Sequence, residues 1–554
     1  MVVLVMVALL ALLAAGFAFM VHANLNTVLA EQQRFRARMA AESGVQRAIV
    51  ALMRDPDDPA KSNDLDRWFD NPDEFWGGVV SGGEGNERSL GQEGLRSRTS
   101  EEATYDPNAD AVWRFSLVAT NYDDPETVRY GITDECSKLD LNRATESQLR
   151  RLFQSVIPQD SENPVDINVL VDSLLDWRGD VAEGVPAGQP RPNGAKDAYY
   201  LTLDPPYRCK NGPFATVEEL LLVRGFTGWV LFGEDYNRNG LLDEAEDDGD
   251  ETFPPDNADG RLFPGVAPFL TVWSIETNTA NDNKPRINLN LQDTEKLQEK
   301  LTEYFDGQII SYIMEVRASG KTFNSVMNLL PAPPTPEEEP AESPPDPTTL
   351  PSGEPSTSQP GDDSDGNSGD GESNSADQQS PPTRSENQQP TSQPVYSNLT
   401  EAEPPGTYET LPLILDRLTT DLRTEIRGRI NVSTAPREVL AMIDGLTEEE
   451  LDAIVAVRRE LSGEEKSTPA WLVTKGVLDE YKFRGILDKI TAKSAVYHVQ
   501  SLGYADNSGV VERLSVVVKM QGPIPQVLYY RNLTSLGPAY RPHGEERRDT
   551  KSAG

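Results

Sequence analysis

The hydrophobic pattern divides the first 54 residues into two halves. Residues 1–21 contain neither a charge nor a proline, and about 20 such residues suffice to cross the core of a bilayer. Beyond them the pattern continues as an amphipathic helix, which distinguishes the segment from a cleavable signal peptide. Its apolar positions are Leu25, Val28, Leu29, Phe35, Met39, Val45, Ile49 and Leu52. The pattern predicts one helix over residues 1–54, half in the membrane and half in water.

Alternation of apolar and polar residues predicts β-hairpins at two distant places. Residues 112–135 alternate on both sides of an Asp-Asp-Pro turn, and residues 496–520 alternate around a turn at 507–509. Both hairpins can lie in one antiparallel sheet on which the long helix packs. The predicted fold class is therefore α+β.

A repeated phrase occurs three times between these hairpins. Each copy begins with a short apolar-polar-apolar strand, continues through a helix cap, and then places apolar residues three and four apart. The third copy adds a turn at Gly445 and a capping box of Thr447 with Glu450. The pattern predicts helix-hairpin-helix (SAM-like) units inserted between the strands. The copies are "KLDLNRATESQLRRLF" from Lys138, "RINLNLQDTEKLQEKL" from Arg286 and "RINVSTAPREVLAMIDGL" from Arg429, with caps at Thr145, Asp293 and Thr434.

The charge of the chain disfavours nucleic acid as a partner. Ninety acidic residues against 51 basic ones leave a formal charge of -39. Hairpins of this kind can bind DNA phosphates through turn amides, but the third one carries Glu448, Glu449, Glu450 and Asp452 where a phosphate would sit. A membrane-anchored DNA receptor of a competence system remains an alternative. The three histidines lie far apart, so the sequence predicts no enzyme, and a hydrolase with an unrecognised site is a third hypothesis.

One segment, "DYNRNGLLDEAE" at 235–246, has the order of a calcium-binding EF-hand loop. Gly240 supplies the sharp turn, and the rival interpretation is a solvated acidic turn. The preceding "GFTGWVLFGE" is too short for a good entering helix, so we expect an isolated loop with a structural calcium ion. The oxygen donors are Asp235, Asn237, Asn239, the carbonyl of Leu241, Asp243 and Glu246; additional candidates are Asp247, Asp248, Asp256 and Asp259.

Four phrases around the first copy occur in an order that resembles the type II secretion system protein K family. They are "GITDECSKLDLNRAT", "LLDWRGD", "GAKDAYY" and "PPYRCKNGPFATVEELLLVRGF". Two residues depart from the family pattern: Asp180 stands in a reduced acidic motif, and Lys196 stands in place of an acid. Val5 stands where major pilins carry a glutamate, an acid that K-type members characteristically lack. The matching positions are Asp134, Glu135, Lys138, Asn142, Asp176, Trp177, Tyr199, Tyr200, Asn211, Pro213, Phe214, Glu218, Glu219 and Leu220.

The resemblance implies a pilin-like fold and a non-enzymatic minor pseudopilin. Such a protein would sit at the pseudopilus tip with the I- and J-type minor pseudopilins and support protein export, with secreted proteins as further partners. It would be a single-pass inner-membrane protein, anchored by residues 1–21, with its bulk in the periplasm and with bound calcium. In an oxidising periplasm Cys136 and Cys209 can form a disulfide, which the sequence does not decide. The family's aromatic residues are expected to build a core.

The predicted domains follow from these patterns. Residues 331–405 are rich in Pro, Ser, Gly, Gln and acids, which predicts a disordered acidic linker. The divisions are 1–54, the transmembrane and amphipathic spine helix; 55–135, the pilin-like strands; 136–285, the first helical domain with the calcium loop; 286–330, the second hairpin unit; 331–405, the linker; 406–495, the third unit; 496–525, the C-terminal β-hairpin; and 526–554, a tail.

Overall fold

The computed structural model describes three stretches of the chain. They are residues 2–53, 65–81 and 112–537, with gaps at 125–126, 159–163, 182–183, 187, 250, 252–255, 257, 333–398, 507–508 and 522–523. Most of the predicted acidic linker lies outside the described residues. Helix α1 spans Val2–Leu52, which confirms the single long N-terminal helix. By length and composition it is the one described helix that qualifies as a membrane span.

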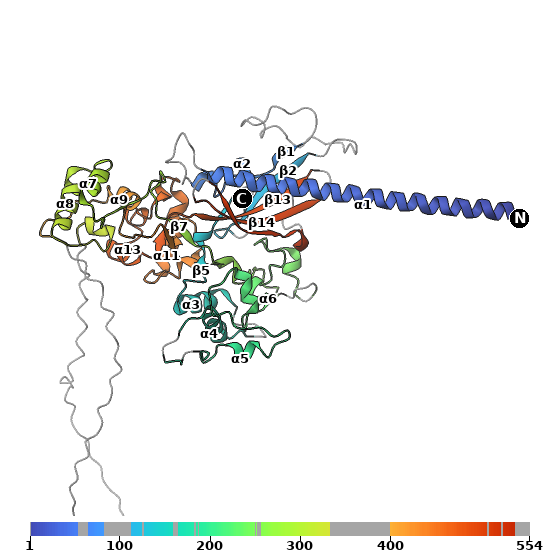
Figure 1. The fold of residues 1–554 in the computed structure, drawn as a ribbon, viewed down its shortest axis with the longest axis horizontal. Helices are drawn as coiled ribbons and strands as arrows, with labels where there is room; N and C mark the ends of the chain where they lie inside the picture. The colour runs from blue at the N-terminus through green and yellow to red at the C-terminus, as the bar shows by residue number, and fades with distance from the viewer. Residues whose placement is uncertain are drawn as a thin grey trace, which may run out of the picture. The chain divides into compact units, whose positions relative to one another are not determined.

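Helix α1 packs along one face of an antiparallel sheet (Figure 1). The sheet has the order β1-β2-β13-β14-β15, with β3 added to β2 and β4 added to β13. Both predicted hairpins are present, although the first is joined by only two residue pairs, Ala119 with Arg129 and Thr120 with Val128. The strands are β1 (Gly78–Ser81), β2 (Trp113–Thr120), β3 (Val128–Arg129), β4 (Thr133–Asp134), β13 (Val496–Ala505), β14 (Val511–Lys519) and β15 (Gln526–Asn532).

The contact between α1 and the sheet depends on small residues. Ala37, Ala41 and Ala48 are fully buried, and the Ser501 hydroxyl donates to the Ala41 carbonyl at 2.8 Å. A Cβ at Gly503 of β13 would lie 1.9 Å from the Ala37 carbonyl oxygen. The helix therefore approaches the sheet more closely than larger side chains would permit.

The buried face of α1 differs from the predicted apolar face. Val45 and Ile49 are buried as expected, but the large residues nearer the N-terminus are exposed in the described structure, Phe35 by 64%. The reason is that the sheet begins only at about Ala37, so the preceding turns have no partner surface among the described residues. The exposed members of the predicted face are Leu25, Val28, Leu29, Phe35 and Met39.

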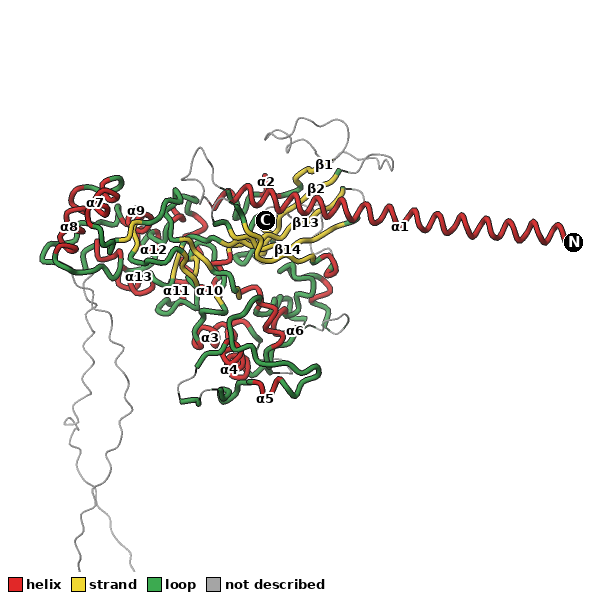
Figure 2. Tube along the Cα trace, viewed as in Figure 1, coloured by secondary structure: helices red, strands yellow, loops and turns green. Residues whose placement is uncertain are grey.

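Three similar units follow one another in the sequence between strands β4 and β13, and Figure 2 shows their helices outside the sheet. Each opens with a two-residue strand and closes with another two-residue strand, which pairs with the first in parallel. The amide after each opening strand donates to the closing threonine's carbonyl: Leu141 to Thr271, Leu289 to Thr419 and Val432 to Thr491, at 2.8, 2.9 and 3.0 Å. The strand pairs are β5 (Leu139–Asp140) with β6 (Leu270–Thr271), β8 (Ile287–Asn288) with β9 (Leu418–Thr419), and β11 (Ile430–Asn431) with β12 (Ile490–Thr491).

Helices fill each unit and bury a common hydrophobic core. The caps expected at Thr145 and Asp293 accept from the backbone, whereas the short helix of the third copy begins after Pro436. The first unit holds α3 (Glu146–Val156), α4 (Ile167–Arg178), α5 (Asp197–Tyr200) and α6 (Gly228–Phe232); the second α7 (Thr294–Thr302), α8 (Gly307–Ala318) and α9 (Leu411–Arg417); and the third α10 (Arg437–Leu440), α11 (Glu448–Glu460), α12 (Trp471–Thr474) and α13 (Glu480–Ile486). The short helix α2 (Pro72–Phe75) lies beside β2, and β7 (Ile275–Thr277) pairs with β10 (Glu425–Arg427).

Two predicted domain boundaries are corrected by this arrangement. The second unit does not end at residue 330, because β9 closes it against β8 after the linker, so residues 411–419 belong to the second unit and not to the third. The segment 526–554 is not only a tail, because β15 pairs with β14 and extends the sheet. The first error arises because strand pairing between distant segments leaves no local signal in the sequence. The second concerns a strand that pairs with the one immediately before it in the chain.

Buried charges hold the units to one another. Glu276 in β7 is 1% exposed and accepts from Arg286 at 3.0 Å and from Arg429 at 3.3 Å, the cations that open the second and third units. Burial acts to raise the pKa of Glu276, but these two arginines and Lys493 outweigh it and hold the pKa below its ordinary value. The carboxylate therefore stays charged and joins the two units.

Candidate functional site: the acidic loop and the adjoining pocket

The predicted calcium loop follows α6, and its last three residues form a short 3-10 turn at Glu244–Glu246. Its first residue, Asp235, accepts hydrogen bonds from the amides of Asn239 at 2.9 Å and Gly240 at 3.0 Å. Gly240 has a φ of +71°, so the sharp turn uses the left-handed conformation that favours glycine. The loop therefore has the compact turn that the sequence predicts.

The later positions of the loop gather around Asp243. The side-chain amides of Asn237 and Asn239 donate to the Asp243 carboxylate at 2.6 and 2.9 Å. Glu246 reaches back to accept from the Asp243 amide at 3.3 Å. The structure thus brings the predicted donors of residues 235–246 into one small loop.

Two of these oxygens are buried without a partner. Glu246 Oε1 and Asn237 Oδ1 accept no hydrogen bond from the described residues. Burial is the main cause that raises the pKa of Glu246 to about 7, and the nearby Asp235 adds to it. Burial likewise raises the pKa of Asp235 to about 6. Unsatisfied buried oxygens beside costly negative charges are what a cation would stabilise.

The arrangement of acidic side chains in and around the loop does not favour a metal site. No group of three or more His, Cys, Asp or Glu side chains in the described part of the chain is arranged to hold a metal ion. Three of the four additional aspartates accept hydrogen bonds from backbone amides of their own segment, and Asp248 donates its amide to one of them. Asp247 accepts from Gly260; Asp256 accepts from Asp248, Gly249 and Ala258; and Asp259 accepts from Arg261.

A buried arginine fixes the loop to the sheet. Arg513 of β14 is 0% exposed and donates to the carbonyls of Asn237 and Arg238, and also to Gln500 at 2.9 Å. Arg238 has a φ of +57°, which is uncommon for a residue with a side chain. The sheet therefore holds the loop in a conformation that determines where the Arg238 side chain points.

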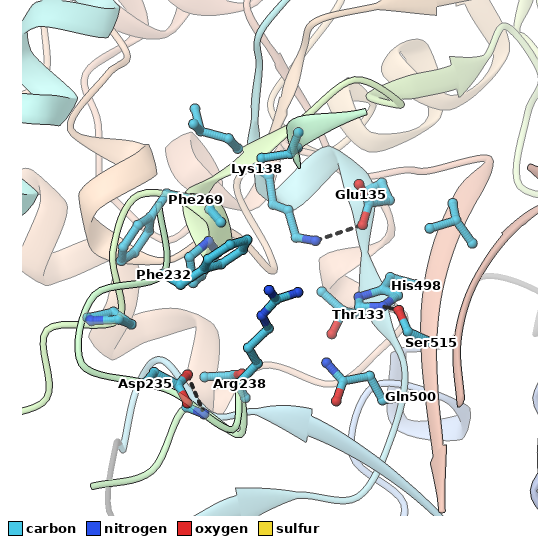
Figure 3. A pocket seen from close by; sticks show the side chains of 18 of the residues that line it. Thr133, Glu135, Lys138, Phe232, Asp235, Arg238, Phe269, His498, Gln500 and Ser515 are labelled. Carbon is cyan, nitrogen blue, oxygen red and sulfur yellow. Dashed lines mark hydrogen bonds and ion pairs between the residues drawn. The ribbon is translucent and has the colours of Figure 1, made fainter. Parts of the chain in front are cut away.

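That side chain enters a pocket of about 350 Å³ between the first unit and the sheet face opposite α1. Figure 3 shows Arg238 between Phe232 and the polar side chains of the sheet. The guanidinium lies 3.6 Å from the centroid of the Phe232 ring. The walls are largely aromatic, with Tyr122, Phe232, Phe269, Trp273 and Tyr529.

The floor of the pocket is the part formed by β13 and β14, and its polar side chains are uncharged. His498 Nε2 lies 2.7 Å from the Ser515 hydroxyl, and both face the pocket (Figure 3). Burial, and next the charge of Lys138, lower the pKa of His498 to about 4, so the imidazole is neutral at pH 7. Gln500 completes the floor.

The family-like residues around the first unit have structural contacts. Asp134 is buried and accepts from Asn431 at 2.6 Å and Thr434 at 2.9 Å in the third unit, while Glu135 pairs with Lys138 at 2.7 Å. The expected aromatic core is confirmed for Trp177 and Tyr200, which form an edge-to-face pair with centroids 5.1 Å apart, and for Phe214. It is not confirmed for Tyr199, which is 37% exposed.

Reciprocal bonds to the Phe214 backbone fix Asn142, with Nδ2 donating at 3.1 Å and Oδ1 accepting at 2.7 Å. Lys196, one of the departures, donates to Asn211 Oδ1 at 2.7 Å, whereas Asp180 accepts from Arg178. Cys136 and Cys209 are both buried as free thiols, so no disulfide joins them in this structure.

Sequence reasoning missed three residues of the pocket region. Arg513 and His498 each take a polar position in a strand that alternates apolar and polar residues, and the shared polar face is the signal that was available. Arg238 carried no such signal, because a cation inside an acidic loop resembles an ordinary solvated residue.

Comparison with known protein families identifies the class of protein to which part of this chain is similar. The chain has a long apolar N-terminal helix on an antiparallel sheet, and residues 132–231 match the family model of type II secretion system (T2SS), protein K. The match confirms the resemblance seen in the sequence: the chain carries a domain of the type II secretion system protein K family.

Two further comparisons were made. No curated protein matches the chain. Among solved structures, the chain is similar to one in the GspK-GspI-GspJ complex from the enterotoxigenic Escherichia coli type 2 secretion system, at 10% sequence identity and a TM-score of 0.31, over 92% of this chain and 99% of that chain.

Proposed function

We propose that the protein is a minor pseudopilin of a type II secretion system and supports protein export. The observation that carries this proposal is the protein K family match at 132–231 in a chain whose long apolar helix packs on an antiparallel sheet. Deletion of the gene should leave secreted proteins in the periplasm, and the full-length gene in trans should restore their export. Normal export in the deletion strain would contradict the proposal.

In this proposal the protein caps the pseudopilus together with the I- and J-type minor pseudopilins. The solved complex named above contains GspK, GspI and GspJ, and we propose partners of the same types here. The exposed apolar residues of α1 support assembly, because Leu25, Phe35 and Met39 have no partner surface in the described chain. The three helical units add bulk to the part of the protein that the sheet separates from α1. This bulk suits a tip and not a shaft, since a shaft subunit must pack on every side.

The membrane orientation belongs to the same proposal. Residues 1–21 would cross the inner membrane once and place the remaining chain in the periplasm. Alkaline phosphatase fused after residue 537 should then be active and β-galactosidase at the same position inactive. The reverse pattern would place the units in the cytoplasm.

We also propose that residues 235–246 hold one structural calcium ion. The donors would be Asp235, Asn237, Asn239, Asp243, Glu246 and the Leu241 carbonyl, all of which present the oxygen ligands that calcium prefers. The two buried oxygens without a partner, Asn237 Oδ1 and Glu246 Oε1, support this reading. Bound calcium would neutralise repulsive carboxylates and fix the loop on the sheet.

Calorimetry tests the calcium proposal with a matched pair of variants. Glu246→Gln removes a buried ligand and should weaken calcium binding at least about tenfold, whereas Glu244→Gln removes an exposed neighbouring charge and should leave it nearly unchanged. Calcium should also raise the unfolding temperature of the parent chain. The absence of calcium binding by the parent, or equal effects of both variants, would refute the site.

The helical units are proposed to be helix-hairpin-helix copies without a role in DNA binding. The repeated caps and closing strand pairs support the assignment. At the third hairpin, Glu448 and Asp452 pair with Arg437 at 2.5 and 2.7 Å, which leaves acids and not cations at the helix start. DNA binding at moderate salt would favour the competence receptor instead. We propose no enzymatic activity.

A further inference from the structure

One guanidinium in the pocket has no anionic partner among the described residues. The guanidinium of Arg238 stacks on the Phe232 ring. No carboxylate of the described chain forms an ion pair with this guanidinium. The other two cations that line the pocket are paired: Lys138 with Glu135 at 2.7 Å and Arg531 with Glu218 at 3.1 Å. An anion that enters the pocket would therefore meet one available charge.

Charged groups of both signs surround Arg238. The charged groups that act most strongly on it are Arg531, Glu218 and Arg513, two cations and one acid. Asp235 is close to Arg513, but its carboxylate is directed to the amides of its own loop. Because Arg531 is paired with Glu218 and Asp235 is directed to its own loop, one negative charge that enters the pocket would balance the Arg238 guanidinium.

The other acids of the pocket set the charge that it can accept. Glu135 and Glu218 are already neutralised by their partners, and Glu438 of α10 lines the pocket and acts on the Tyr122 phenol. A dianion such as phosphate would meet four carboxylates, with Asp235 as the fourth, around one available cation. A monoanion matches the pocket better, and a carboxylate fits the planar fork of a guanidinium.

The walls determine the remainder of the ligand. Trp273 and Tyr529 lie with ring centroids 5.6 Å apart, and Phe269 and Leu270 extend the apolar surface. A volume of about 350 Å³ accommodates a small ring system and not a long chain. Neutral donors and acceptors on the floor, Ser515 and Gln500 among them, can orient a ligand without repelling it.

We propose that this pocket binds a monocarboxylate with a flat apolar body, its carboxylate on Arg238 and its body against Trp273 and Tyr529. The chemistry is found in free aromatic acids and at the C-terminus of a polypeptide that ends in an aromatic residue. The site is distinct from the secretion role, and it adjoins the proposed calcium loop, whose Asp235 lines the pocket. The rigid hold of Arg513 on the loop places the guanidinium before the ligand arrives.

Ligand-observed NMR on the full chain in lipid nanodiscs tests the proposal, with empty nanodiscs as the blank. One arm titrates indole-3-acetate against indole-3-acetamide, and the other titrates acetyl-Gly-Gly-Phe with a free carboxylate against its amide. In whichever arm binds, the acid should bind at least about tenfold more tightly than the amide, because the amide lacks the charge-assisted bond. The arm with the tighter acid identifies the source of the ligand.

Variants then assign the binding to Arg238. Arg238→Gln should weaken binding of the acid about tenfold and leave the amide unchanged, while Arg238→Lys should lie between them. Arg208→Gln is the matched control, because this side chain is 80% exposed and outside the pocket, and it should have no measurable effect. Circular dichroism of each variant establishes that it is folded.

Several results would overturn the proposal. Acid and amide binding equally, no binding in either arm, or an Arg238→Gln variant that binds as the parent does would each remove the role of the guanidinium. Displacement of indole-3-acetate by inorganic phosphate at the same concentration would refute the preference for a monocarboxylate. The acid-against-amide comparison uses the parent chain alone, so it holds even where a variant fails to fold.

Discussion

The closest contact between α1 and the sheet gives a quantitative prediction for Gly503→Ala. A methyl group at Gly503 would lie 1.9 Å from the Ala37 carbonyl oxygen and 2.4 Å from the Ala41 nitrogen. Both are backbone atoms, so no side chain can rotate away to make room. Either α1 or β13 must move, and the Ser501 hydrogen bond to Ala41 lies in the same contact.

The expected cost is at the upper end of what overpacking produces, about 3 kcal/mol of unfolding free energy. The matched control is Gly307→Ala at the first turn of α8, where a Cβ would meet nothing within 4 Å. There alanine should be neutral or stabilise by up to about 1 kcal/mol, because it lowers the entropy of the unfolded chain. Urea unfolding of the detergent-solubilised full chain, followed by near-ultraviolet circular dichroism, compares the two.

Equal unfolding midpoints for the two variants would refute the packing argument. A loss in Gly307→Ala as large as that in Gly503→Ala would mean that any added methyl destabilises the chain, and the close approach would explain nothing. A loss confined to Gly503→Ala would establish that small residues on both surfaces set the distance between helix and sheet.

Two further predictions concern buried charges. Glu276→Gln should cost about 3–5 kcal/mol of stability because it leaves Arg286 and Arg429 without their carboxylate, whereas the exposed Glu295→Gln should cost less than about 1 kcal/mol; equal midpoints in urea would contradict this. His498 has a folded-state pKa of about 4 against 6.5 ordinarily, so the unfolded chain binds more protons between these values and stability should fall as pH drops from about 6.5 to about 4. His498→Gln should flatten that part of the pH curve, and an unchanged curve would show that the imidazole is not the group responsible.

The elements with local signals could be predicted from sequence. The uncharged run of residues 1–21 predicts the long helix, and the alternation at 496–520 predicts the paired strands β13 and β14. The phrases from Lys138 and Arg286 predict their helix starts because a cap residue bonds to amides two or three positions away. In each case the interacting residues are close in sequence.

The elements that depend on distant pairing could not be predicted. Strand β9 closes the second unit against β8 at a separation that spans the acidic linker, and no pattern near residue 418 marks it. Strand β15 pairs with the preceding strand β14, but its run Val-Leu-Tyr-Tyr does not alternate apolar and polar residues, so the pattern did not mark it as a strand. The buried face of α1 was misjudged because alanines carry the contact, and periodicity of large residues does not detect them.

The candidate site shows the same division. The order of donors in residues 235–246 was visible in the sequence, and the structure places them in one loop with a left-handed Gly240. The pocket beside it is assembled from the first unit, the ends of β4, β13 and β14, and Tyr529 of β15. Its existence depends on how the first unit lies against the sheet, which no single segment of the chain specifies.

Co-purification from native membranes tests the central proposal most directly. The full chain, tagged at its C-terminus, is isolated from cells that express the I- and J-type minor pseudopilins of the same secretion system. We predict that both proteins remain bound through size-exclusion chromatography in mild detergent. Recovery of the two partners bound to each other but not to this chain would contradict its assignment as a minor pseudopilin.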